Sequence, residues 1–180
     1  LMIDINSAEE ALTDKTVAIM PTQLNGRTCD MDEIINFATK NNLSIYEDAA
    51  QALGSKFKNK YAGTFGIASA ISLYPAKILG CLGDGGAILT NDSDVYEQIL
   101  LLRDHGRNPT SGEVISWGFN SRLDNIQAAF LNYFFSTYDE VILKRRYFAK
   151  LYDEGLNEIE EIYLPEPPNN GDHFDVFQNY

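Results

Sequence analysis

The chain has 180 residues, of which 44% are hydrophobic and 22% are charged. This balance is typical of a packed globular protein and disfavours an intrinsically disordered chain. The 26 acidic residues outnumber the 14 basic ones and give a net charge of −12. That charge argues against non-specific nucleic-acid binding, which needs clustered Lys and Arg.

The cysteine and histidine counts and the lengths of the apolar runs indicate which kinds of site and which cellular location to expect. Two cysteines and two histidines argue against a disulfide framework and against a metal site. No apolar run approaches the roughly 18–20 residues of a membrane span, and the first ten residues lack the positive start of a signal peptide. We therefore predict a cytoplasmic protein with no membrane segment. Because the chain starts at Leu1 and stops at "DVFQNY", we expect it to be truncated at both ends.

The first part of the chain predicts a strand–helix–strand unit. Thr16–Met20 is apolar and β-branched, which indicates a short buried strand. Asp30 and Glu33 form a capping-box pattern ahead of a helix over Met31–Asn41, and Leu43–Glu47 predicts the next strand. Because the unit takes only about thirty residues, we expect its two strands to be parallel.

Two further strands and a helix are predicted next. The strands cover Ala68–Tyr74 and Gly86–Thr90. Asp92 can cap a helix that runs to about His105 and ends at Gly106. The pattern as a whole indicates an α/β fold with a mixed, mostly parallel sheet and flanking helices.

Helical periodicity dominates the region that follows. It covers about Arg122–Asn157, with a break near Thr137, and Ser121 with Asp124 resembles another capping box. A proline-rich stretch, Pro165–Pro168, then marks a linker.

Asp48 is a candidate ligand-binding residue in the stretch "YEDAAQALG". It falls at the carboxyl end of a predicted strand, the edge where α/β sheets bind ligands. A carboxylate beside Ala49 and Ala50 needs a cationic partner. Asp48 is equally well explained as the N-cap of a following helix, with Gln51 completing a capping box. Gln51 could instead point its amide at a ligand, and both interpretations stay open.

Lys77 is the second candidate, in the stretch "SLYPAKILGCLGDGGAILT". A lysine in a loop is by default a surface residue. Here, however, it lies between apolar runs and ahead of several glycines, which permit tight turns and the close approach of a bulky group. The spacing is not GxGxxG and a strand follows, so a dinucleotide phosphate loop is a poor fit. A partly desolvated lysine is a nucleophilic amine of the kind that Schiff-base chemistry requires.

Together these stretches carry a family resemblance. The ordered motifs "EDAAQALG", "GTFG", "SLYPAKILGCLGDGGAILTND", "LLRDHG" and "GFNSRLDNIQAA", between about Asp14 and Tyr152, are similar to those of the DegT/DnrJ/EryC1/StrS family. These are pyridoxal-phosphate aminotransferases that act on nucleotide-linked keto sugars. The resemblance implies the large domain of fold type I, with residues 1–135 as part of that pyridoxal-phosphate-binding domain. Residues 136–180 would form a connecting helix and the start of the C-terminal small domain.

The resemblance also implies a role for each site residue. Lys77 matches the lysine that forms the internal aldimine with pyridoxal 5'-phosphate, and Asp48 matches the aspartate that pairs with its pyridinium nitrogen. Gln51 matches the position that contacts the cofactor ring, and Ser72 matches a serine that hydrogen-bonds the phosphate. Asn120 matches an asparagine that reaches the phosphate of the neighbouring subunit's cofactor, because family members are homodimers with active sites shared at the interface.

The resemblance predicts transfer of an amino group from an amino acid, glutamate or glutamine being the usual donor, to a nucleotide-linked keto sugar. A sugar dehydratase of the same family is an alternative, but its lysine is replaced by histidine, and Lys77 is present here. A non-catalytic regulator on the same fold is disfavoured because Asp48, Ser72 and Lys77 are all intact. The upstream phosphate-binding loop and most of the small domain are absent, so we expect residues 1–180 alone to be inactive. The sugar, the carbon aminated and the pathway, whether surface polysaccharide or antibiotic sugar, are not predicted.

Overall fold

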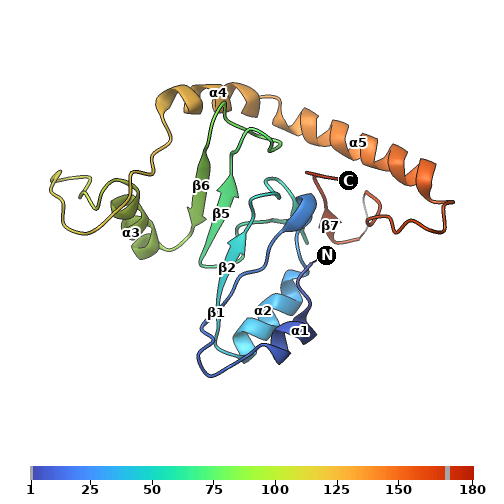
Figure 1. Ribbon diagram of the computed structural model, residues 1–180, viewed down its shortest axis with the longest axis horizontal. Helices are drawn as coiled ribbons and strands as arrows, with labels where there is room; N and C mark the ends of the chain where they lie inside the picture. Colours follow the sequence, from blue (N-terminus) through green and yellow to red (C-terminus); the bar gives the residue numbers. More distant parts are fainter. Residues whose placement is uncertain (1, 169–170) are drawn as a thin grey trace.

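The computed structural model describes residues 2–168 and 171–180 and is built around a four-stranded sheet (Figure 1). The strand order is β1-β2-β5-β6; the first three strands are parallel, and the last is antiparallel to its neighbour. The strands are β1 (Ala18–Ile19), β2 (Ser44–Asp48), β5 (Ala68–Ser72) and β6 (Gly86–Thr90). The predicted mixed, mostly parallel sheet is confirmed, and the carboxyl ends of β2 and β5 lie at the same edge.

Helix α2 (Met31–Lys40) connects β1 to β2, which confirms the predicted strand–helix–strand unit. Asp30 caps this helix, because its Oδ1 accepts hydrogen bonds from the N–H groups of Asp32 and Glu33 at 3.1 and 3.2 Å. The buried face of α2 joins one apolar cluster, the α2 core: Ile19, Cys29, Met31, Ile34, Phe37, Ala38 and Phe57. Burying each large side chain of this kind contributes about 1.5–3 kcal/mol.

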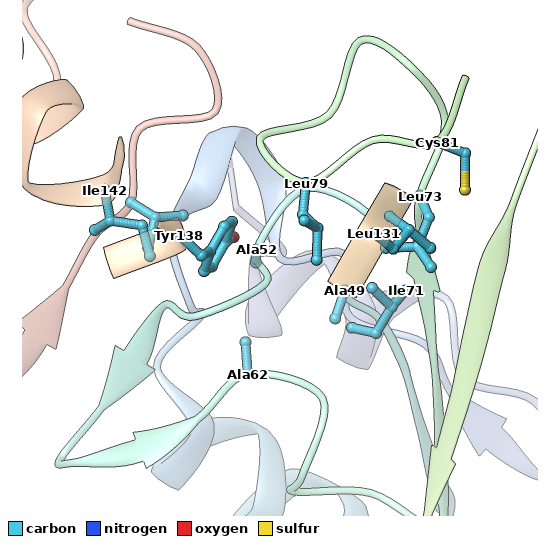
Figure 2. Packing of buried hydrophobic residues seen from close by; sticks show 11 residues of the cluster. Ala49, Ala52, Ala62, Ile71, Leu73, Leu79, Cys81, Leu131, Tyr138 and Ile142 are labelled. Atoms are coloured by element: carbon cyan, nitrogen blue, oxygen red, sulfur yellow. The ribbon is translucent and has the colours of Figure 1, made fainter. Parts of the chain in front are cut away.

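A second apolar cluster lies toward the carboxyl edge of the sheet, and we call it the pocket core (Figure 2). Its members are Ala49, Ala52, Ala62, Ile71, Leu73, Leu79, Cys81, Leu131, Tyr138, Ile142 and Val176. They come from β5, from the loops after β2, β4 and β5, from two helices and from the C-terminal segment. Because the loop after β5 carries Leu79 into this cluster, the packing fixes that loop against the sheet edge.

Three further helices follow β6: α3 (Ser93–Arg103), α4 (Asn125–Phe135) and α5 (Tyr138–Leu156). Helices α4 and α5 follow one another across the top of Figure 1, with the predicted break between them confirmed. The N-cap of α4 is Asp124, whose Oδ1 accepts from the Gln127 N–H at 2.9 Å. The predicted capping box that begins at Ser121 is therefore wrong, because Ser121 lies three residues before the cap.

Several short elements were not predicted from the sequence. They are α1 (Ile5–Glu10), a 3-10 turn over Leu24–Gly26, β3 (Lys56–Phe57), β4 (Lys60–Tyr61) and β7 (His173–Phe174). Lys58 and Asn59 turn β3 into β4 with φ angles of 47° and 63°, the left-handed conformation that two-residue hairpins need. Strand β7 pairs antiparallel with β3 and so brings the C-terminal segment back to the middle of the chain. Across the described residues, no helix has the length and apolar character needed to cross a membrane.

Candidate functional site

The loop after β5 holds Lys77 in a closed turn. The Lys77 N–H donates to the Tyr74 carbonyl at 2.9 Å, and the Cys81 N–H donates to the Leu73 carbonyl at 2.7 Å. A Cβ added to Gly80 would lie 2.7 Å from the Tyr74 carbonyl oxygen, which no side chain tolerates. At this position glycine permits the tight turn, which is one of the two roles that the sequence suggested for these glycines.

Lys77 lines a small pocket at the carboxyl edge of β2 and β5. The lining residues are Ala50, Gln51, Leu53, Ser72, Lys77, Ile78, Leu79, Tyr138 and Gln178. Three of the five predicted site residues are therefore brought together, Gln51 from the loop after β2, and Ser72 and Lys77 from the end of β5 and the loop after it. The space between these side chains is about 10 Å³, room for about one water molecule.

Asp48 is the last residue of β2 and lies beside this pocket without lining it. Its backbone is held on both sides, because its N–H donates to Pro21 at 3.0 Å and its carbonyl accepts from Gln23 at 2.8 Å. The carboxylate Oδ1 accepts from the Ala50 N–H at 3.1 Å, and no ion pair involves it among the described residues. Residues 49–54 contain turns and no helix, so the interpretation of Asp48 as a helix N-cap is wrong.

Gln51 has one end of its side chain fixed by a distant segment. Its Oε1 accepts a hydrogen bond from the Asn25 N–H at 2.8 Å. The predicted capping box with Asp48 does not form, because Gln51 pairs with this backbone group from the 3-10 turn instead. Among the described residues no hydrogen bond involves its NH₂ group, which can donate two.

Ser72 and Asn120 occupy different environments. Ser72 ends β5 and lines the pocket, with its Oγ accepting from the Tyr74 N–H at 3.3 Å. Asn120 is exposed in the segment between α3 and α4, which extends away from the sheet (Figure 1). Its Oδ1 accepts from Arg122 at 3.0 Å, and Arg122 also pairs with Asp104 at 2.9 Å. The structure thus does not bring Asn120 to the pocket that Lys77 lines within this chain.

Glu47, which the sequence analysis did not single out, is buried at 2% exposure next to Asp48. Its Oε1 accepts from the Phe65 and Gly66 N–H groups at 2.6 and 3.0 Å. Its Oε2 accepts from the Gly63 N–H at 2.7 Å and from the Gln23 Nε2 at 2.9 Å. Charge-assisted bonds of this kind are strong, so Glu47 fixes the "GTFG" loop against the end of β2.

Tyr138, also missed by the sequence analysis, closes one side of the pocket from the start of α5. Its hydroxyl donates to the Leu53 carbonyl at 2.7 Å. Burial raises the pKa of this phenol well above its ordinary value, so the group remains a neutral donor. In Figure 2 the Tyr138 ring lies near Ala52, within the same cluster as Leu79.

Comparison with known proteins places these features in a family. Over residues 1–180 the chain matches the DegT/DnrJ/EryC1/StrS aminotransferase family, and it belongs to that family. It is 39% identical over 178 residues to a "Pleiotropic regulatory protein" of Geobacillus stearothermophilus, covering 99% of this chain and 48% of the relative. It is 35% identical over 182 residues to the dTDP-3-amino-3,4,6-trideoxy-alpha-D-glucose transaminase of Micromonospora megalomicea subsp. nigra, with the same two coverages.

Solved structures share the fold. DesV of S. venezuelae, crystallised with a ketimine intermediate, superposes with a TM-score of 0.86 at 35% identity, over 98% of this chain and 47% of DesV. The E. coli GDP-4-keto-6-deoxy-D-mannose-3-dehydratase with bound hydrated PLP gives a TM-score of 0.85 at 26% identity, over 99% of this chain and 49% of that one. The predicted fold type I architecture is confirmed. The chain spans about half the length of the curated relatives it matches.

Proposed function

We propose that this chain is part of a pyridoxal-phosphate-dependent aminotransferase that moves an amino group from an amino acid to a nucleotide-linked keto sugar. One observation carries the proposal: Gln51, Ser72 and Lys77 meet in a single pocket beside the end of the strand that carries Asp48. Membership of the family and the transaminase among the relatives support it.

The donor set suits the chemical groups of pyridoxal phosphate. Lys77 provides an amine for its aldehyde, and Asp48 provides a carboxylate for its ring nitrogen. Ser72 provides a hydroxyl for its phosphate. When bound, this cofactor supplies a conjugated ring that withdraws electrons from the bond being broken. The hydrated PLP in the solved structure of the dehydratase supports the same cofactor here.

The residues of this chain would act as follows. Lys77 would hold the cofactor through Nζ, and the same amine would move a proton as general base and acid. The Asp48 carboxylate keeps a proton on the ring nitrogen through a charge-assisted hydrogen bond. The Gln51 NH₂ group donates toward the ring, and the Ser72 hydroxyl donates to the phosphate.

The proposal extends to the assembly and to the substrates. Glutamate is the proposed amino donor, and the protein is proposed to be a cytoplasmic homodimer with shared active sites. Asn120 would serve the partner's cofactor, which agrees with its exposed position away from the Lys77 pocket. Residues 1–135 would belong to the cofactor-binding domain and residues 136–180 to the connection with a small domain.

The test is substitution of Lys77 in the complete polypeptide that contains this chain. Lys77→Ala should lower amino transfer from glutamate to a panel of nucleotide-linked keto sugars on the order of a thousandfold, because general acid–base catalysis is lost. Lys15→Ala, at an exposed lysine, is the matched control and should retain the rate. Wild-type transfer by Lys77→Ala would refute the proposal.

A regulatory role is the second candidate, and the name of one relative favours it. A regulator that does not catalyse has no use for an exchangeable cofactor. Titration of the complete polypeptide with glutamate separates the two functions, because a transaminase converts the absorbance of its bound cofactor to that of the amine form. The dehydratase among the solved structures marks a third outcome, in which the sugar loses its hydroxyl and gains no nitrogen.

A further inference from the structure

The C-terminal segment reaches the loop that carries Lys77. The Ile78 N–H donates to Oε1 of Gln178 at 3.1 Å, and Nε2 of Gln178 donates to the Ala76 carbonyl at 3.1 Å. One carboxamide thus contacts the residue before Lys77 and the residue after it. Gln178 lies 100 residues beyond Ile78 in the sequence, so this contact exists only in the folded chain.

Gln178 is itself held in place by its neighbours. Its N–H donates to the Asn25 carbonyl at 3.0 Å, and its own carbonyl accepts from Arg145 at 3.3 Å. The Asn25 N–H in turn donates to Oε1 of Gln51. A continuous series of hydrogen bonds therefore connects Gln51 to the Lys77 loop through Asn25 and Gln178.

The chemistry of the side chain matches the two backbone groups. A carboxamide offers a donor and an acceptor on one planar group, and the loop presents one N–H and one carbonyl. A glutamate at position 178 would accept from Ile78 but would repel the Ala76 carbonyl. Leucine, of similar size, would satisfy neither group.

We propose that Gln178 is a positioning residue for Lys77. By fixing the backbone on both sides of Lys77, it sets where the amine lies relative to Gln51 and Ser72. This inference rests on the proposed function, because the amine matters only if it reacts. A displacement of about 1 Å at a reacting group can cost on the order of a hundredfold in rate.

The hydrogen bonds themselves can be tested without any reaction. In the complete polypeptide, Gln178→Leu should speed amide exchange at Ile78 about tenfold, because that N–H loses its acceptor. Gln178→Glu keeps the acceptor and should exchange at Ile78 as the wild type does. Asn179→Ala is the control, since Asn179 contacts Asn25 at 3.1 Å and makes no hydrogen bond to the Lys77 loop among the described residues.

The positioning role needs a second readout. Pyridoxal phosphate is added to the cofactor-free protein, the adduct is fixed by borohydride, and the labelled lysine is located by mass spectrometry. The initial rate of labelling at Lys77 should fall about tenfold in Gln178→Leu and less in Gln178→Glu, and it should be unchanged in Asn179→Ala. Circular dichroism establishes that each variant is folded at the temperature used.

Each outcome separates the two proposals. Faster exchange at Ile78 with wild-type labelling of Lys77 would leave Gln178 as a structural contact and overturn its positioning role. Exchange and labelling that both match the wild type would overturn the contact as well. A wild type that is never labelled at Lys77 would overturn the proposed function, and with it the positioning role, even if exchange is faster in Gln178→Leu. Should Gln178→Leu not fold, wild-type labelling by Gln178→Glu would count against the proposal and slower labelling would support it.

Discussion

The α2 core and the pocket core differ in how far apart along the chain their members lie. All of the α2 core falls between Ile19 and Phe57, and one helix supplies four of its seven buried residues. The pocket core draws on residues from Ala49 to Val176. Local contacts cost little loop-closure entropy, whereas distant ones must wait until the chain has folded back. The site that includes Lys77 therefore rests on the less local of the two cores.

Buried polar contacts join the two cores. Glu47 bonds to Gln23, which contacts Met31 of the α2 core, and also to the "GTFG" loop that leads into β5. The hydroxyls of Thr28 and Ser55, both fully buried, lie 2.8 Å apart. Because such contacts are directional, they fix the position of one core relative to the other more narrowly than apolar packing alone.

Replacing Glu47 should lower the free energy of unfolding more than the other substitutions, because it removes the polar contacts between the two cores. Glu47→Leu leaves three backbone N–H groups and the Gln23 amide without their buried acceptor. We expect a loss of about 4–5 kcal/mol in the free energy of unfolding, measured by urea denaturation of the complete polypeptide.

Glu33→Leu is the matched control for Glu47→Leu. Glu33 lies exposed in the first turn of α2, so the same substitution should cost less than about 0.5 kcal/mol. Similar losses for the two variants would show that the buried network contributes nothing specific.

A pair of truncations sharpens the comparison of the cores. Ile34 of the α2 core and Leu79 of the pocket core are both buried, with 1% and 7% exposure. Ile34→Ala and Leu79→Ala should each cost about 3 kcal/mol of unfolding free energy through the cavity that they leave. Only Leu79→Ala should also slow borohydride-fixed labelling of Lys77, because Leu79 anchors the loop that carries it.

The two readouts are measured on the same preparations, at a urea concentration where both variants are folded. Equal labelling rates for Ile34→Ala and Leu79→Ala would contradict the distinction. It would mean that Lys77 responds to overall stability and not to the packing of its own loop.

Local patterns predicted the elements that depend on local contacts. Helix α2 begins at Met31 after its Asp30 cap, and β6 covers Gly86–Thr90, both as the sequence indicated. Strands β3, β4 and β7 escaped prediction because each has two residues and none lies in an apolar run like Thr16–Met20, which contains the equally short β1. The cap of α4 was misplaced because two acceptable capping residues, Ser121 and Asp124, stand three positions apart.

The residues of the candidate site also divide into those that the sequence indicated and those that it did not. The convergence of Gln51, Ser72 and Lys77 was implied by family motifs, and the pocket brings these residues together. Glu47 and Gln178 were missed because their partners are backbone groups of distant loops, for which a sequence carries no residue-type signal. A charged residue at the end of a strand predicted to be buried, as Glu47 is, was the one available hint.

His173 gives the smallest expected effect and tests how the C-terminal segment is held on the α2 core. Its ring lies 4.9 Å from that of Phe57, to which β7 brings it. Burial lowers the pKa of this imidazole, and the nearby Arg27 lowers it further, against the weaker opposing effects of Asp175 and Asp30. The His173 imidazole therefore binds a proton less readily in the folded protein than in the unfolded chain.

The sign of the pH dependence follows from that difference. As the pH falls through the ordinary histidine range, near 6.5, the unfolded chain gains the proton first, so the free energy of unfolding decreases. His173→Phe keeps the ring against Phe57 and removes the titration. Between pH 7.5 and 5.5 the wild type should lose stability more steeply than His173→Phe, as measured by urea denaturation at each pH. Parallel curves would mean that His173 is protonated as readily in the folded protein as in the unfolded chain, and that β7 holds the C-terminal segment on the α2 core without a pH-sensitive contact.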